Sequence, residues 1–125
     1  MSKAQPLVAV VDDDEAVGRA LNRLLRSAGL KAETFVSGSE FLKSLEDHAP
    51  DCIVLDLQMA HVDGFEVQSR LAQTGQSMPV IVITGRDTPG AYERATRGGA
   101  IAYLRKPIDD KALLDAIGTA VTRMS

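Results

Sequence analysis

Four short apolar runs divide the chain, and each stops abruptly at a polar residue or a turn signal. They cover residues 7–11, 52–55, 80–83 and 101–104. Continuous runs of this length, mixing β-branched and aliphatic side chains, are typical of strands buried on both faces of a sheet. The polar–apolar alternation of residues 31–35 predicts a further strand nearer the sheet edge.

Segments with a helical period separate these strands. Apolar residues recur at i, i+4, i+7, i+8 and i+11 in the first of them, namely Val17, Leu21, Leu24, Leu25 and Ala28. This spacing predicts an amphipathic helix that Gly29 ends. Four more helices are expected, and they open at residues 37–40, after Asp63-Gly64, at a Thr88 N-cap with Pro89 in the first turn, and at Asp109-Asp110. Alternation of strand and helix predicts one α/β domain over residues 1–125, with helices on both faces of a parallel sheet.

Residues with acid–base or metal-binding chemistry follow the predicted strands. Asp12-Asp13-Asp14 follows the first run and Asp56 the second, while Thr84 and Lys106 follow the last two. Because ligands bind at the carboxyl ends of strands in open parallel sheets, these side chains are expected to converge. Several carboxylates in one place are unfavourable without a cation. Oxygen ligands without Cys or His suit Mg²⁺, and a lysine with a hydroxyl can hold a phosphoryl group.

Each of these residues also has a structural explanation. Asp14 is better explained as the N-cap of the first helix, and a lone aspartate after a strand, such as Asp56, is often a loop or cap residue. Thr84 could cap a turn, and Lys106-Pro107 could be a surface turn. Because all of these residues lie at strand ends, we favour the interpretation that they form one shared site. In such a site an aspartate can act as the nucleophile and form an aspartyl-phosphate.

Composition and charge argue against several classes of protein. The 125 residues carry 14 Lys and Arg against 17 Asp and Glu, a net charge of −3, which argues against nucleic-acid binding through a basic face. We find no apolar stretch long enough to span a membrane and no signal-peptide core, and we predict a cytoplasmic location. The single cysteine, Cys52, is expected to be a buried apolar side chain.

The motifs at the strand ends resemble the receiver domain of two-component response regulators. They are Val10-Val11-Asp12-Asp13, Ile53-Val54-Leu55-Asp56-Leu57-Gln58-Met59, Asp63-Gly64, Val82-Ile83-Thr84-Gly85 and Tyr103-Leu104-Arg105-Lys106-Pro107. They occur in the family order and cover essentially the whole chain. The stretch from Thr84 to Pro89 is most similar to the FixJ-like branch.

The resemblance implies a flavodoxin-like, doubly wound sheet with strand order 2-1-3-4-5. Asp56 would be the phosphoacceptor, and Mg²⁺ would be bound by Asp13, by Asp56 and by the backbone carbonyl of Gln58, with Asp12 acting through water. Lys106 would pair with the phosphoryl group and Thr84 would donate its hydroxyl to it. The resemblance also implies that the rotamer of Tyr103 follows Thr84 and that the Lys106-Pro107 bond is cis.

The same resemblance implies the partners. A histidine kinase or phosphotransfer protein would donate the phosphoryl group, and the chain would have no enzymatic activity beyond intrinsic phosphotransfer and self-dephosphorylation. The chain would be a stand-alone receiver or the regulatory domain of a transcription regulator. It would contact neither nucleic acid nor membrane directly. A homodimer could form through the last strand and the two helices that flank it.

Some residues depart from the family pattern, and one other class of protein remains open. The loop Met59-Ala60-His61-Val62-Asp63-Gly64 lacks the usual proline at position 60, which leaves its shape less preset. Gln58 and Arg86 flank the expected site and would tune the phosphoryl lifetime. The alternative is a haloacid-dehalogenase-like phosphatase with Asp12 as the nucleophile, but that scheme gives Asp56 no role.

Overall fold

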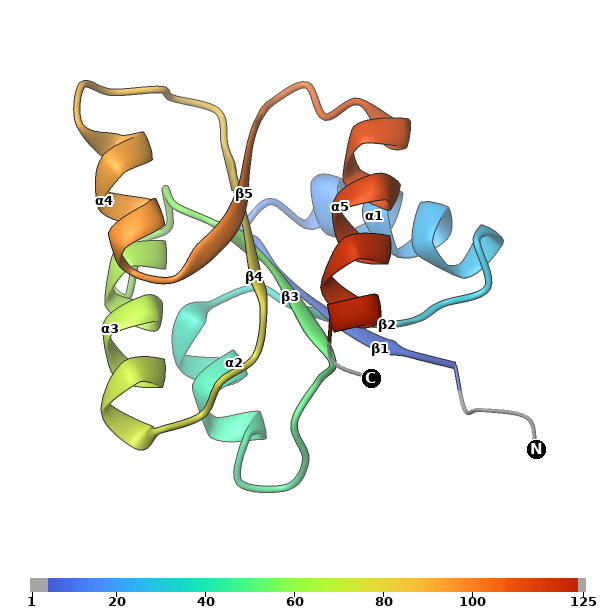
Figure 1. Cartoon of the computed structure of the whole chain (residues 1–125), viewed down its shortest axis with the longest axis horizontal. Coiled ribbons are helices and arrows are strands. Elements are labelled where there is room, and N and C mark those ends of the chain that lie inside the picture. Colours follow the sequence, from blue (N-terminus) through green and yellow to red (C-terminus); the bar gives the residue numbers. More distant parts are fainter. Residues whose placement is uncertain (1–4, 124–125) are drawn as a thin grey trace.

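A parallel sheet with strand order β2-β1-β3-β4-β5 forms the centre of the computed structural model, which describes residues 5–123 (Figure 1). The strands are β1 (Leu7–Val11), β2 (Lys31–Phe35), β3 (Cys52–Asp56), β4 (Val80–Thr84) and β5 (Ala100–Arg105). Every neighbouring pair is parallel. The predicted strand order and the alternation of strands and helices are confirmed.

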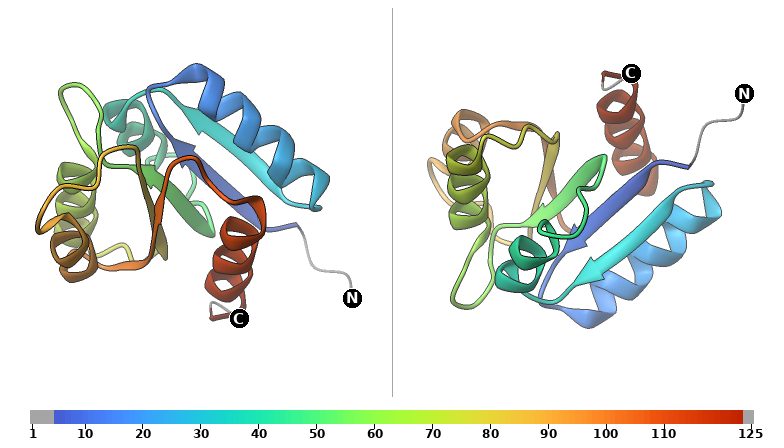
Figure 2. Two further views of the ribbon diagram at one scale, coloured as in Figure 1. Left: turned by 90° about the horizontal axis from the view of Figure 1, so that it is seen from above. Right: turned by 90° about the horizontal axis from the view of Figure 1, so that it is seen from below.

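Helices cover both faces of the sheet (Figure 2). α1 (Glu15–Ser27) and α5 (Asp110–Arg123) lie on one face, and α2 (Gly38–Ser44), α3 (Gly64–Thr74) and α4 (Ala91–Arg97) lie on the other. Successive strand residues point to opposite faces, so Val10 packs with the α1 and α5 side while Val11 packs with the other. Both faces of the inner strands are therefore buried, as their continuous apolar runs predict.

Polar residues at the helix ends position the loops around the sheet. The Asp14 carboxylate accepts hydrogen bonds from the backbone N–H groups of Ala16 and Val17 and caps α1, as predicted. Asp63 caps α3 by accepting from the Glu66 N–H at 2.9 Å. At the other end of α1, Gly29 has φ 85°, a conformation that glycine adopts without steric cost.

The start of α4 differs from the prediction. Thr88 does not cap this helix, which begins at Ala91 after Gly90. The Ala91 N–H donates to the Thr88 carbonyl at 3.1 Å, and Gly90 has φ 82° and ψ −8°. Proline followed by a left-handed glycine is the pattern of a type II turn. Residues 88–91 therefore form a turn, and the helix is shorter than expected.

The last strand is also less buried than predicted. All residues of β3 and β4 are buried, whereas those of β5 are half-buried or exposed. β5 is an edge strand with one neighbour, β4. One of its faces is covered by α4, which is a short helix. An apolar run at an edge cannot be distinguished by composition from one in the centre.

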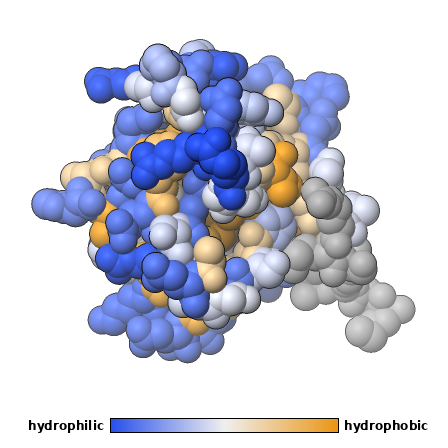
Figure 3. All heavy atoms as spheres, turned by 60° about the vertical axis from the view of Figure 1, so that its left-hand side comes forward, coloured by the Kyte–Doolittle hydropathy of each residue, from blue (hydrophilic) through white to orange (hydrophobic). Residues whose placement is uncertain are grey.

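The outer surface is mainly hydrophilic. Figure 3 shows hydrophobic atoms only in small separated groups on the face that it presents. The large apolar side chains that are exposed in the described residues are Val36 and Tyr92, at 40% and 53%. Within residues 5–123, no helix combines the length and hydrophobicity needed to cross a membrane.

Candidate functional site at the carboxyl ends of the strands

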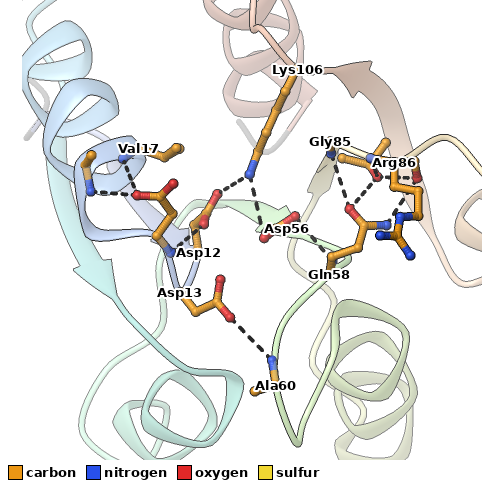
Figure 4. A network of polar contacts seen from close by, with 12 residues as sticks. Asp12, Asp13, Val17, Asp56, Gln58, Ala60, Gly85, Arg86 and Lys106 are labelled. Atoms are coloured by element: carbon orange, nitrogen blue, oxygen red, sulfur yellow. Dashed lines mark hydrogen bonds and ion pairs between the residues drawn. The ribbon is translucent and has the colours of Figure 1, made fainter.

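Three carboxylates converge where β1 and β3 end (Figure 4). Asp12 follows β1, Asp13 comes next, and Asp56 is the last residue of β3. One oxygen from each lies within 4.8 Å of the others. Asp12 and Asp56 are each only 2% exposed, whereas Asp13 is exposed. The predicted convergence of these acids is therefore present in the structure.

An open cavity of about 430 Å³ lies over these carboxylates. Its lining residues are polar or charged apart from one glycine, and they are Asp12, Asp13, Asp14, Asp56, Gln58, Gly85, Arg86 and Lys106. They come from the end of β3 and from the loops that follow β1, β3, β4 and β5. The cavity is therefore built by segments that are far apart in the sequence and that the parallel sheet brings together.

Lys106 brings a positive charge to the carboxylates. Its Nζ lies 2.9 Å from Asp12 Oδ2 and 3.7 Å from Asp56 Oδ2. Burial lowers the pKa of Lys106, but the hydrogen bond to Asp12 and the charges of both carboxylates outweigh burial and raise the pKa. Lys106 therefore stays protonated at neutral pH, and it sits closer to Asp12 than to Asp56.

The negative charge of the Asp56 carboxylate is only partly offset by its neighbours. Burial raises its pKa from 3.8 to about 6, and the charge of Asp12 adds to this effect. Lys106 and the Gln58 N–H, which donates to Asp56 Oδ1 at 3.3 Å, lower the pKa only in part. At neutral pH the group is mostly ionised and surrounded by too little positive charge. A divalent cation would relieve this repulsion.

Backbone groups orient the other two carboxylates. The Asp14 N–H donates to Asp12 Oδ1 at 2.9 Å, and the Ala60 N–H donates to Asp13 Oδ2 at 3.3 Å. In each case the second oxygen makes no hydrogen bond to a backbone N–H in the described structure. These hard oxygen donors fit a hard divalent cation such as Mg²⁺.

The loop after Asp56 is held close to the acceptor by Gly64. A Cβ at Gly64 would lie 2.6 Å from the Asp56 carbonyl oxygen and 2.8 Å from Leu57 Cα. The Asp63-Gly64 motif thus has a steric reason, because α3 starts against the backbone of the acceptor. His61, at the exposed loop tip, has φ 66°, a left-handed conformation that costs a non-glycine residue energy.

Thr84 lies beside the cavity rather than in its lining. It is 1% exposed, and its Oγ1 lies 2.7 Å from Gln58 Oε1 and 2.8 Å from the Arg86 carbonyl oxygen. The sequence interpretation gave Gln58 a role through its backbone and its position, and it missed this side-chain contact. A glutamine in a loop carries no pattern that names its partner, so the contact could be found only from the fold.

Tyr103 belongs to a separate polar group on the β5 side. Its hydroxyl donates to Asp87 Oδ1 at 2.8 Å, and Arg105 Nε donates to Asp87 Oδ2 at 2.6 Å. These two hydrogen bonds, that of Arg105 first, lower the pKa of Asp87. The ring of Tyr92 meets Tyr103 edge-on at 5.4 Å. The Lys106-Pro107 bond next to this group is cis, as expected.

Comparison with known proteins places this chain in a family. The family model of the response regulator receiver domain matches residues 8–118. The chain is 39% identical over 122 residues to response regulator protein TmoT of Ectopseudomonas mendocina, covering 97% of this chain and 55% of that protein. It is 37% identical to nodulation protein W of Bradyrhizobium diazoefficiens, covering 98% and 54%. The chain thus spans about half the length of these relatives.

Solved structures agree with this match. A response regulator receiver protein from Burkholderia phymatum is 48% identical with a TM-score of 0.84, covering 94% of this chain and 96% of that chain. A Francisella receiver domain has a TM-score of 0.91 over 97% of this chain and all of its own, at 24% identity, and supports the fold alone. The phosphatase alternative, with Asp12 as the nucleophile, is left without support. The chain belongs to the response regulator receiver domain family.

Proposed function

We propose that the chain accepts a phosphoryl group on Asp56 from a phosphohistidine of a histidine kinase or a phosphotransfer protein. The observation that carries this proposal is the buried, undercompensated Asp56 carboxylate at the floor of an acidic cavity, with Lys106 at 3.7 Å. The open cavity gives a donor imidazole access to this group. The family match supports the same assignment.

The transfer balances as an in-line displacement. An Asp56 oxygen forms a bond to phosphorus while the phosphorus–nitrogen bond breaks, and its electron pair stays on the departing imidazole. Asp56 must be ionised to attack, and its pKa of about 6 leaves it ionised near neutral pH. Lys106 faces the equatorial oxygens and offsets their charge. The ring leaves as neutral imidazole when its other nitrogen carries a proton, and that proton comes with the donor protein.

Asp12, Asp13 and Asp56 fit a bound Mg²⁺, with the Gln58 carbonyl as a further candidate ligand. We assign direct contacts to Asp13 and Asp56 and a water-mediated one to Asp12, as in the family pattern. Mg²⁺ would neutralise phosphoryl oxygens and the excess charge of the carboxylates. The 4.8 Å grouping of the three carboxylate oxygens is the observation that supports this site.

Phosphorylation would then shift the domain between two arrangements. The product places up to about two negative charges and three acceptor oxygens on Asp56. Lys106 can pair with them, and Thr84 can donate its hydroxyl once it leaves its present partners. The rearranged β4–α4 loop would carry the change to Tyr103, because Asp87 in that loop binds its hydroxyl.

The output of the switch is proposed from the relatives. TmoT is named a response regulator and is about twice the length of this chain. We infer a regulatory role in the cytoplasm, either within a transcription regulator or as a stand-alone receiver, without contact of this domain to nucleic acid. The α4, β5 and α5 face, where Tyr92 is 53% exposed, is the proposed dimer surface.

The proposal is tested with beryllofluoride, a phosphoryl mimic, and Mg²⁺. We expect an additional set of shifts in the backbone NMR signals of Gly85, Arg86 and Lys106 when beryllofluoride is added to the protein in Mg²⁺. Asp56→Asn removes the attachment oxygen and should abolish the shifts, whereas the surface variant Asp115→Asn should keep them. Shifts that persist in Asp56→Asn, or that are missing in the unmodified protein, would contradict the assignment.

A further inference from the structure

The side chain of Gln58 joins the β3–α3 loop to Thr84, the last residue of β4, and to the first two residues of the β4–α4 loop. Its Oε1 accepts from the Thr84 hydroxyl at 2.7 Å and from the Gly85 N–H at 3.2 Å. Its Nε2 donates to the Arg86 carbonyl at 3.2 Å. Figure 4 shows the Gln58 amide turned toward Gly85 and Arg86 and away from Asp12 and Asp56. The amide thus uses both of its ends on Thr84 and the two residues that follow it.

This contact covers Thr84. Gln58, Gly85 and Arg86 line the cavity, whereas Thr84 is not among its lining residues and is 1% exposed. A hydroxyl has one proton to donate, and both acceptors in reach of Thr84 belong to Gln58 and Arg86. The hydroxyl therefore points its proton at the loop rather than at the acceptor carboxylate.

We propose that Gln58 is a latch that holds Thr84 and residues 84–86 in the resting arrangement. This inference rests on the proposed function, in which Thr84 must turn toward a phosphoryl group on Asp56. That turn breaks the hydrogen bond to Gln58, so the latch opposes the active arrangement. A ligand shifts a two-state equilibrium only by its differential affinity, so phosphorylation must overcome the latch.

The latch is a positioning role and differs from direct contact with the phosphoryl group. If Gln58 served only by filling space in the loop, its removal would weaken the loop whatever residue stood at position 84. If it acts through the Thr84 hydroxyl, its effect must become smaller when that hydroxyl is gone, because only the contacts with Gly85 and Arg86 remain. A double-mutant cycle between the two positions separates these roles.

The first measurement is beryllofluoride affinity in the presence of Mg²⁺. Gln58→Met keeps the length of the side chain and removes its amide, and we expect it to bind about five- to tenfold more tightly, the weight of one or two neutral hydrogen bonds. In a Thr84→Val background the same change should give a clearly smaller gain, because the hydrogen bond from the Thr84 hydroxyl is already absent. Gln73→Met on the exposed face of α3 is the matched control and should behave like the unmodified protein.

The second measurement is amide hydrogen exchange without any phosphoryl mimic. The Gly85 N–H donates to Gln58 Oε1, so it should exchange several-fold faster in Gln58→Met and at the normal rate in Gln73→Met. Unchanged beryllofluoride affinity in Gln58→Met, or the same gain in the Thr84→Val background, would overturn the latch. If the unmodified protein does not bind beryllofluoride, the proposed function fails. The latch is then decided by exchange at Gly85, where faster exchange supports it and unchanged exchange overturns it.

Discussion

The Lys106 ammonium donates to Asp12 Oδ2 at 2.9 Å across 94 positions of the chain. The side chain of Lys106 is 24% exposed and that of Asp12 only 1%. The parallel pairing of the strands explains the contact, because β1 and β5 both direct their carboxyl ends to the same edge of the sheet. In the resting protein the lysine is thus committed mainly to Asp12, and Asp56 remains the carboxylate in need of charge.

Removing this ammonium should destabilise the protein in a pH-dependent way. Lys106→Met leaves Asp12 and Asp56 buried without their cation, and we expect a loss of about 2 kcal/mol near pH 7. Lys106 lowers the pKa of Asp56, so this pKa rises further in the variant, and the folded state then takes up more protons than the unfolded state as the pH falls. The loss should therefore shrink toward pH 5.

Urea denaturation at both pH values measures this effect. Lys111→Met is the control, because Lys111 pairs with Asp115 on the exposed surface of α5, where an ion pair contributes little. An equal loss at both pH values in Lys106→Met would argue against the charge explanation.

The buried Asp56 carboxylate should itself lower stability at neutral pH. Its pKa rises from 3.8 to about 6, so between these values the folded protein keeps a proton that the unfolded chain has lost. Stability from this group is present below that window and is lost as the pH rises through it. Without Mg²⁺, Asp56→Asn should be about 2–3 kcal/mol more stable near pH 7 and little changed near pH 3.5. A variant less stable than the unmodified protein at neutral pH would refute this.

Replacement by alanine should have opposite effects on stability at two of the glycines. In Gly64→Ala the new Cβ would meet backbone atoms of Asp56 and Leu57, and we expect a loss of more than about 2 kcal/mol and weaker binding of beryllofluoride. Gly118 lies in α5 with nothing within 4 Å of such a Cβ, so Gly118→Ala should stabilise by about 0.5–1 kcal/mol. Thermal unfolding compares the two, and a tolerated Gly64→Ala would contradict the close approach.

The His61 loop offers a further stability test. His61 adopts φ 66°, so His61→Gly relieves a left-handed conformation and should stabilise by up to about 1 kcal/mol. Ala60→Gly next to it, where φ is not positive, should instead destabilise by about 0.5–1 kcal/mol. Equal effects at the two positions would show that backbone strain at His61 is not important.

Most of the fold follows from local patterns that agree with one another. The inner strands are continuous apolar runs, and Asp14, Gly29 and Asp63 mark helix ends by hydrogen bonding or by conformation. The start of α4 was predicted wrongly because Thr88-Pro89 suits both a cap and a turn. Gly90 decides for the turn, since it supplies the positive φ that a type II turn requires.

The residues of the site could be predicted from the sequence, but the hydrogen bonds and ion pairs between them could not. Aspartates at strand ends interrupt apolar runs in the sequence, so Asp12 and Asp56 could be identified directly. The preference of Lys106 for Asp12 and the contact between Gln58 and Thr84 depend on side-chain placement across loops far apart in the sequence. No periodicity encodes such placement, and only the folded structure reveals it.

The most direct test of the central claim is the mass of the protein after incubation with acetyl phosphate. In the presence of Mg²⁺ we expect the mass of one phosphoryl group to be added. Peptide mapping should place it on Asp56, and neither Asp56→Asn nor protein treated with a chelator should gain it. A phosphoryl group on Asp12, or one retained in Asp56→Asn, would contradict the account.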